Sequence, residues 1–181
     1  ADGEESRGYF EALEIRTMVA LLQLLCSRRQ DVPLLTVLRA PFVGLEHDEL
    51  VAIRASREQG SFYEALLAAS QQEGPLGDKL RALLAKLDRW SLAARHMPMD
   101  SLLWWLYDET GYYLTAGALP KGAQRQGNLR MLVERAEQFR QCAPGGVAQF
   151  IEHLTRLRAA DKDLGAAHLM GEGEDVVRVM S

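Results

Sequence analysis

Paired carboxylates are the side chains of this sequence whose spacing comes nearest to acid–base chemistry. Glu11 and Glu14 lie three residues apart, as do Glu46 and Glu49, so each pair shares one face if its segment is helical. Two carboxylates on one face can serve as general acid and base. At the start of a helix, however, acidic residues more often stabilise the positive end of the helix dipole. We therefore interpret both pairs as helix-start residues.

Cysteine and histidine, the other common catalytic and metal-binding types, show no informative spacing. Cys26 and Cys142 are not part of a Cys-x-x-Cys pair, so they predict neither a metal site nor a disulfide framework. We expect both to be reduced structural thiols of a cytoplasmic protein. No histidine stands at metal-ligand spacing from another histidine or a cysteine. Surface or capping roles are expected for all four: His47, His96, His153 and His168.

Sequence motifs for catalysis and the net charge limit the function further. The chain has no G-x-x-x-x-G-K-[ST] phosphate loop, no G-x-G-x-x-G fingerprint and no G-x-S-x-G elbow. We therefore predict no catalytic residue, no metal and no cofactor in this chain. Its net charge is -4, whereas a dedicated nucleic-acid binder usually carries surplus Lys and Arg for phosphate contacts. Any DNA contact should therefore be local, modest, or made mainly by other parts of a larger protein.

The elements that would position these residues are mostly helices. Hydrophobic residues make up 48% and recur every three or four positions, the helical period. Helices are predicted over residues 9–26, 33–38, 48–59, 62–70, 78–96, about 101–110, 124–139 and 147–158. Residues 112–122 are predicted to be a loop with at most a short extended or helical piece. No apolar run approaches the roughly 20 residues that span a membrane.

The last residues break this helical pattern. Residues 175–180 are rich in β-branched side chains and predict a strand. A single strand cannot satisfy its own backbone hydrogen bonds, so its sheet should lie elsewhere. The expected fold class is therefore mainly α: an irregular multi-helix domain with a short terminal β-strand.

The most aromatic region of the chain lies at residues 104–113, with Trp104, Trp105, Tyr107, Tyr112 and Tyr113. Exposed aromatic rings can stack on unpaired bases. In a leucine-rich helix they are more often core anchors, which is the interpretation we favour. At least one of the two adjacent tryptophans should nevertheless point away from the core, where it could mark an interdomain contact.

Several stretches carry a family resemblance. They are GYFEALEIRTM (8–18), RRQDVPL (28–34), VLRAPFVGL (37–45), DETGYY (108–113), GALP (117–120) and QRQGNLR (124–130). Together they resemble the UvrD/RecB superfamily-1 helicases, and the AddA subunits of AddAB helicase–nucleases in particular. The end, EDVVRVMS (174–181), resembles the strand that leads into helicase motif V, a strand that would belong to the second motor domain.

The resemblance implies a domain division and a function. Residues 1–30 would be a helical stub of the second motor domain, 31–165 a 2B-type helical subdomain, and 166–181 a return linker and strand of the motor domain. The parent would be an ATP-dependent DNA helicase and exonuclease, using ATP and Mg²⁺, in double-strand break repair and recombination. This part would be a non-catalytic, DNA-positioning and regulatory subdomain that alone hydrolyses no ATP and cuts no DNA. Its implied partners are the motor domains, DNA as a duplex or a duplex/single-strand junction, and an AddB-like subunit, without a membrane.

The resemblance also carries candidate residues. In UvrD-like relatives a T-P-K-R-G-I-G turn offers backbone amides to duplex phosphates. Here the matching residues 40–46 keep Pro41 and Gly44, but replace the two basic residues with apolar ones and the second glycine with glutamate. We therefore take Gly44, with Arg39 beside it, as a candidate phosphate contact. Arg28 and Arg29 are further candidates, with a solvated-surface role as the alternative for all three arginines.

Two more residues match an R-x-x-N-L pattern of the same subdomain. Arg125 and Asn128 share one helix face, and we expect them to hold a loop or a cap. A different function class stays open: a free-standing helical module that binds a protein partner through its aromatic segment. The terminal strand separates the two possibilities, because a free-standing module has no reason to end on one.

Overall fold

The computed structural model describes the backbone of residues 8–179, with side chains described through residue 167 and at 170 and 171. A helical turn at residues 8–11 precedes α2, and short connections join the helices that follow. Their bounds are α2 (Leu13–Cys26), α3 (Asp31–Arg39), α4 (His47–Ser56), α5 (Phe62–Ser70), α6 (Pro75–His96), α7 (Met99–Thr110), α8 (Tyr112–Ala118), α9 (Gly122–Cys142) and α10 (Val147–Val179). The prediction of a mainly α fold is confirmed.

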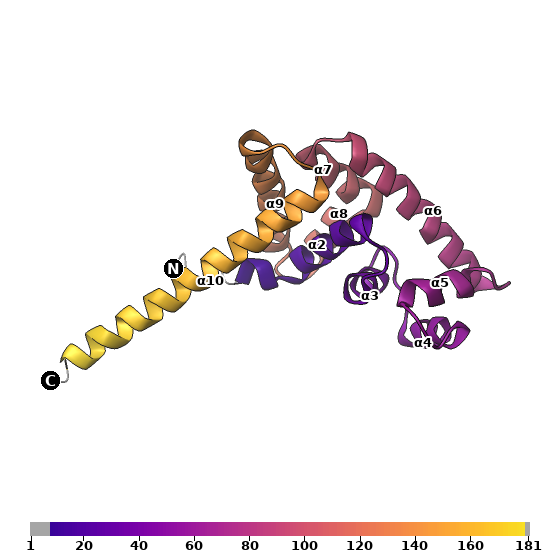
Figure 1. Ribbon diagram of the computed structural model, residues 1–181, viewed down its shortest axis with the longest axis horizontal. Coiled ribbons are helices and arrows are strands. Elements are labelled where there is room, and N and C mark those ends of the chain that lie inside the picture. Colours follow the sequence, from indigo (N-terminus) through magenta and orange to yellow (C-terminus); the bar gives the residue numbers. More distant parts are fainter. Residues whose placement is uncertain (1–7, 180–181) are drawn as a thin grey trace.

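Helix α2 runs through the middle of the molecule. It packs against α3, α6, α9 and α10, while α4 and α5 form a lobe at one end of α6 and α7 lies at the other (Figure 1). Its inward residues are fully buried, among them Ile15, Met18 and Leu21. They recur at three-residue steps, so they share one face of the helix. The first long helix is therefore the centre of the hydrophobic core.

Local sequence signals fix several helix ends. Ser61 caps α5 in a capping box: its side chain accepts from the Glu64 amide, and the Glu64 carboxylate accepts from the Ser61 amide. Gly111 adopts the left-handed conformation, with φ 64°, and separates α7 from α8. Both signals are visible in the sequence, because each depends only on the residue type and on neighbours a few positions away. The predicted loop over 112–122 consists largely of α8, with Tyr112 and Ala116 buried.

The predicted strand at the end of the chain is wrong for residues 175–179. These residues belong to α10, which continues as one helix from Val147 to Val179 and extends away from the body of the molecule (Figure 1). A helix satisfies its backbone hydrogen bonds within its own segment, whereas a strand needs a neighbour. The described residues include no strand with which residues 175–179 could pair, so these residues continue the helix that precedes them. Residue 180, the last of the predicted strand, lies outside the described residues.

Candidate nucleic-acid interface

The turn that follows α3 is closed by backbone hydrogen bonds. The amides of Val43 and Gly44 both donate to the carbonyl of Ala40, at 3.0 and 2.7 Å, and the Leu45 amide donates to the Leu38 carbonyl at 3.0 Å. Gly44 has φ 66°, a conformation that side chains rarely adopt. Three amides of this turn therefore have partners within the chain. A phosphate at Gly44 would have to compete with the bond to Ala40.

Aromatic packing anchors the same turn. The Phe42 ring meets Trp90 of α6 edge to face, with centroids 6.4 Å apart, and meets Tyr112 of α8 in the same way at 5.6 Å. Such pairs add to the stability gained from burying the rings. The residue that stands where the UvrD-like turn has a basic side chain therefore ties the turn to the core.

Arg39 is the cation beside this turn. It lies in the last turn of α3, is exposed, and makes no hydrogen bond or ion pair with any residue that the structure describes. A positive charge at this end also suits the negative end of the helix dipole. Its guanidinium is therefore available to an anion from outside the chain.

Arg28 is held by the protein itself. Its guanidinium donates to the Asp88 carboxylate at 2.7 Å, to the Tyr63 hydroxyl at 3.4 Å and to the Ser91 hydroxyl at 3.5 Å. Partial burial lowers the pKa of Arg28, but the bonds to Tyr63 and Asp88 outweigh this effect and leave the pKa raised. Its side chain is 21% exposed. Arg28 thus fastens the α2–α3 connection to α5 and α6, and DNA would have to displace these bonds to reach it.

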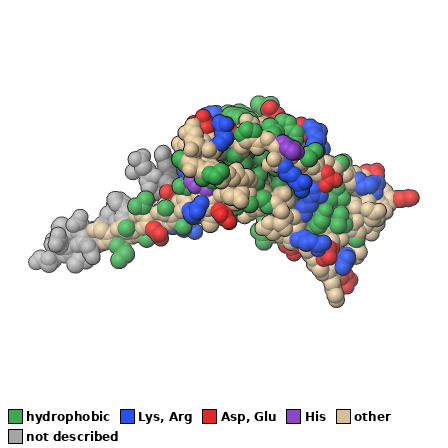
Figure 2. Space-filling view, turned by 45° about the horizontal axis from the view of Figure 1, so that its top comes forward, with side chains coloured by type: hydrophobic (Ala, Val, Ile, Leu, Met, Phe, Trp, Pro, Cys, Tyr) green, Lys and Arg blue, Asp and Glu red, His purple; other side chains and the backbone are tan. Residues whose placement is uncertain are grey.

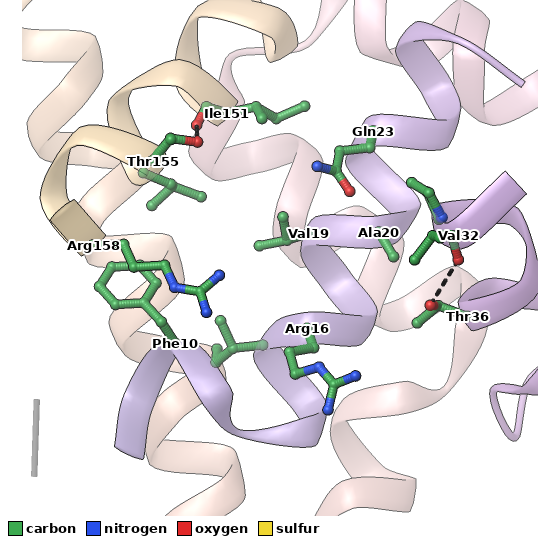
Figure 3. Close-up of a pocket in the computed structure, with 13 residues that line it drawn as sticks. Phe10, Arg16, Val19, Ala20, Gln23, Val32, Thr36, Ile151, Thr155 and Arg158 are labelled. Carbon is green, nitrogen blue, oxygen red and sulfur yellow. Dashed lines mark hydrogen bonds between the residues drawn. The ribbon is translucent and has the colours of Figure 1, made fainter. Parts of the chain in front are cut away.

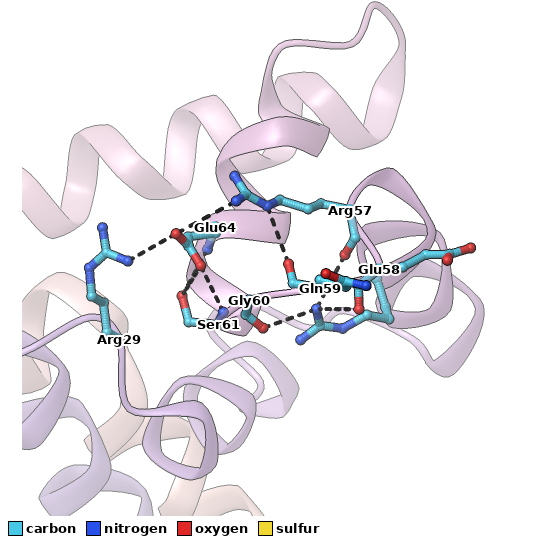
Figure 4. Close-up of polar contacts among 8 residues, drawn as sticks. Arg29, Arg57, Glu58, Gln59, Gly60, Ser61 and Glu64 are labelled. Carbon is cyan, nitrogen blue, oxygen red and sulfur yellow. Dashed lines mark hydrogen bonds and ion pairs between the residues drawn. The ribbon is translucent and has the colours of Figure 1, made fainter.

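Arg29 shares the Glu64 carboxylate with a second arginine. The Glu64 oxygen lies 3.2 Å from Arg29 and 3.9 Å from Arg57, which approach from opposite sides (Figure 4). The hydrogen bond from the Ser61 amide and the one from Arg29 lower the pKa of Glu64. Both arginine side chains remain more than half exposed. They can therefore approach an outside anion without leaving Glu64.

The candidate contacts fall at two places instead of one. Arg28 and Arg29 precede α3 and Arg39 ends it, and a nine-residue helix is about 13 Å long. Lys and Arg side chains gather over the middle of the face in Figure 2, with acidic side chains among them. This face is therefore of mixed sign. The ion pair of Arg57 with Glu64 could not be found from the sequence, because nothing in the residues around Arg57 predicts it.

Arg125 and Asn128 meet at a buried carboxylate. Arg125 donates to one Glu14 oxygen at 3.0 Å, and the Asn128 amide donates to the other at 2.8 Å. Glu14 is 3% exposed, and Arg125 also donates through Nε to the Pro120 carbonyl at 3.0 Å. This network joins α2 to α9 and holds the α8–α9 connection. Glu14 does lie in the first turn of α2, as expected of a helix-start residue, but it is buried and not at an exposed helix start, because α9 covers it.

The aromatic region divides between core and surface. Tyr107 and Tyr112 are buried, and the Tyr107 hydroxyl donates to the Leu129 carbonyl at 2.8 Å. Trp104 is 40% exposed and meets the Tyr113 ring edge to face at 5.4 Å. The core role is therefore confirmed for the tyrosines at 107 and 112. Trp104 is the tryptophan that points away.

The remaining candidate groups stand apart from one another. Cys26 and Cys142 are free and both exposed, and partial burial raises the pKa of the Cys26 thiol. His153 packs against Phe139 and Phe150, where desolvation and the charge of Arg156 lower its pKa.

The described residues include no group of three or more His, Cys, Asp or Glu that could hold a metal ion. None of their helices is both long and apolar enough to cross a membrane.

Comparison with known proteins gives one consistent result. No protein-family model matches the chain. Its relatives include the AddA-type ATP-dependent helicase/nuclease proteins of Thermoanaerobacter pseudethanolicus, 42% identical over 181 residues, and Pelotomaculum thermopropionicum, 45% identical over 182. The corresponding protein of Anoxybacillus flavithermus is 43% identical over 180 residues. All of this chain, or 98% of it in the last case, is covered, but only 14–15% of each relative. The chain is therefore homologous from end to end to one segment of the AddA family of ATP-dependent helicase/nucleases.

Proposed function

We propose that the chain is a non-catalytic, DNA-positioning segment of an AddA-type ATP-dependent helicase and exonuclease in double-strand break repair and recombination. Residues 31–165 form its 2B-type subdomain, and residues 1–30 and 166–181 adjoin the second motor domain. ATP and Mg²⁺ bind elsewhere in the longer protein, an AddB-like subunit is its partner, and the complex works in the cytoplasm. The end-to-end similarity to AddA proteins supports this proposal.

Arg39 is the observation that carries the DNA-positioning role. Its guanidinium is exposed and has no partner among the described residues, whereas Arg28 and Arg29 are both held by carboxylates. It stands beside a turn fixed by three backbone hydrogen bonds and by the Phe42 ring. A rigid support lowers the entropic cost of placing the guanidinium on a phosphate. A single anchored cation fits a local contact in a chain of net charge -4.

The test is binding to a fluorescent duplex with a single-stranded tail, followed by anisotropy at low salt. We expect Arg39→Ala to weaken binding by about 1 kcal/mol, or roughly fivefold, as one exposed phosphate contact would. Arg95→Ala is the matched control, because Arg95 is also an exposed arginine in the last turn of a helix. If Arg39→Ala and Arg95→Ala weaken DNA binding equally, Arg39 contributes only the general attraction of a positive charge and makes no specific phosphate contact.

A free-standing protein-interaction module is the second candidate function. The exposed Trp104 favours it, since tryptophan is enriched where proteins bind one another. Because residues 175–179 are helical, a terminal strand no longer separates the two functions. The two functions differ instead in the substitution to which binding is sensitive. If the chain is a protein-interaction module, Trp104→Ala should abolish binding to the protein partner and leave DNA binding unchanged.

A further inference from the structure

Two arginines share the Glu64 carboxylate at the start of α5. Arg29 comes from the α2–α3 connection and Arg57 from the α4–α5 connection, and both pair with the same oxygen, Oε1 (Figure 4). The other oxygen, Oε2, accepts from the Ser61 amide at 2.8 Å. One carboxylate carries one negative charge, so it balances only one of the two guanidinium groups. The group of three side chains therefore keeps one positive charge in excess.

The backbone of the α4–α5 connection fixes this carboxylate. Gly60 has φ 91°, a conformation that side chains rarely adopt. A Cβ at this position would collide with Oε2 of Glu64, so the close approach of the carboxylate to Ser61 requires glycine. Because Oε2 is bound to the Ser61 amide, the carboxylate has a defined place between the two arginines.

The two arginines are also anchored outside their pairs with Glu64. The Phe62 amide donates to the Asp31 carboxylate at 2.9 Å, which ties the segment that carries Arg29 to the start of α5. Arg57 donates through Nε to the Gln59 carbonyl at 3.2 Å. Both guanidinium groups are therefore placed before a ligand arrives, which lowers the entropic cost of binding an anion.

A different pair of arginines shows what this support adds. Arg16 of α2 and Arg158 of α10 point into the same end of a groove between α2, α3 and α10 (Figure 3). Arg158 pairs with Glu11, whereas Arg16 makes no hydrogen bond or ion pair with the residues that the structure describes. No shared carboxylate fixes these two side chains, so ordering them on a ligand would cost side-chain entropy. The pair at Glu64 is the better preorganised of the two.

The surroundings of the pair at Glu64 favour a phosphate as its ligand. Residues 57–61 are Arg, Glu, Gln, Gly and Ser, without an apolar side chain. The core of a protein–protein interface is enriched in apolar and aromatic groups, whereas phosphate contacts need charge and N–H donors. The side chains of Arg29 and Arg57 are 65% and 55% exposed, so each can present N–H groups to phosphate oxygens. Glu58, the other carboxylate of this segment, points away from Glu64 (Figure 4).

We propose that Arg29 and Arg57 form a second phosphate-binding site for duplex DNA, with Glu64 as the residue that positions both. The inference rests on the proposed function, because it requires that the chain binds DNA. It adds a contact at the other end of α3 from Arg39. The length of α3, about 13 Å, separates the two places, and this is the axial span of about four base pairs. One duplex lying along α3 can therefore meet both.

The test is anisotropy of the fluorescent tailed duplex over a series of salt concentrations. We expect Arg57→Ala to weaken binding about fivefold and to reduce the magnitude of the salt slope by about 1. Arg57→Lys should restore the slope, because the charge returns, but not the full affinity, because lysine lacks the planar fork. Arg140→Ala is the matched control: Arg140 is 52% exposed and pairs with one carboxylate, that of Asp100, so its removal should leave the slope unchanged.

An unchanged slope for Arg57→Ala would overturn the inference, and so would an equal loss for Arg140→Ala. Wild-type affinity of Arg57→Lys would refute recognition by the guanidinium fork. If poly-glutamate displaces the labelled duplex better than unlabelled duplex of equal charge does, the ligand is an acidic peptide and the inference is also overturned. Should Arg39→Ala weaken binding while Arg57→Ala does not, the DNA-positioning role stands and the second site falls. No binding by the wild-type chain would contradict both.

Discussion

Removing the Glu14 carboxylate should destabilise the fold more than removing any exposed acidic side chain. Glu14→Ala leaves Arg125 and the Asn128 amide without their shared acceptor beneath α9. Breaking a fully buried ion pair costs about 3–5 kcal/mol, and an unsatisfied buried donor about 1–3 kcal/mol. Arg125 is 27% exposed and keeps its bond to Pro120, so water offsets part of this loss. We expect the free energy of unfolding to fall by about 2–3 kcal/mol.

The assay is thermal unfolding followed by circular dichroism, with urea unfolding to obtain the free energy. For a domain of this size the loss corresponds to a fall in Tm of about 5–10 °C. Glu14→Gln keeps the shape but turns an amide NH₂ toward one of the two donors, so it should also destabilise, by about 1–2 kcal/mol. Glu11→Ala is the control, because its side chain is 56% exposed and its pair with Arg158 is worth less than about 1 kcal/mol. A Glu14→Ala variant as stable as Glu11→Ala would refute the account of the α2–α9 network.

Three further substitutions test other parts of the structure. Arg28→Ala should lower the free energy of unfolding by about 1 kcal/mol in urea unfolding, because it frees the α2–α3 connection from Asp88, and an unchanged midpoint would contradict this role. Ser61→Ala should remove about 1 kcal/mol by deleting the α5 cap, whereas Ser61→Gly should cost only a few tenths. His153 has a pKa lowered below 6.5, so the folded state binds its proton less readily than the unfolded state. Its contribution to stability is present above pH 6.5 and is lost as the pH falls below that value; His153→Phe should weaken this pH dependence of Tm.

Elements with local signals could be predicted from the sequence. The α5 capping box needs residues only three positions apart, and Gly111 needs only its own freedom to adopt a positive φ. The Leu-rich periodicity of α2 and α6 likewise predicts helices, because one apolar face must be buried. These signals were sufficient for the mainly α class and for most helix positions.

Features that depend on distant residues could not be predicted. Glu14 lies 111 residues from Arg125 and 114 from Asn128. The sequence therefore does not reveal that the three side chains contact one another. Arg28 and Arg39 are the same residue type, and only the fold gives the first a carboxylate and leaves the second without a partner among the described residues. The residues at 175–179 have high β propensity, but propensity forms a strand only where a neighbour completes its hydrogen bonds.

The most direct test of the DNA-positioning role is the salt dependence of tailed-duplex binding by the wild-type chain and by Arg39→Ala. Each phosphate contact contributes a slope of about -0.9 to the plot of log affinity against log salt concentration. If Arg39 binds a phosphate, its removal should reduce the magnitude of the slope by about 1, and Arg95→Ala should leave the slope unchanged. An identical slope for the wild-type chain and Arg39→Ala, or no binding by the wild-type chain at low salt, would contradict the proposed role.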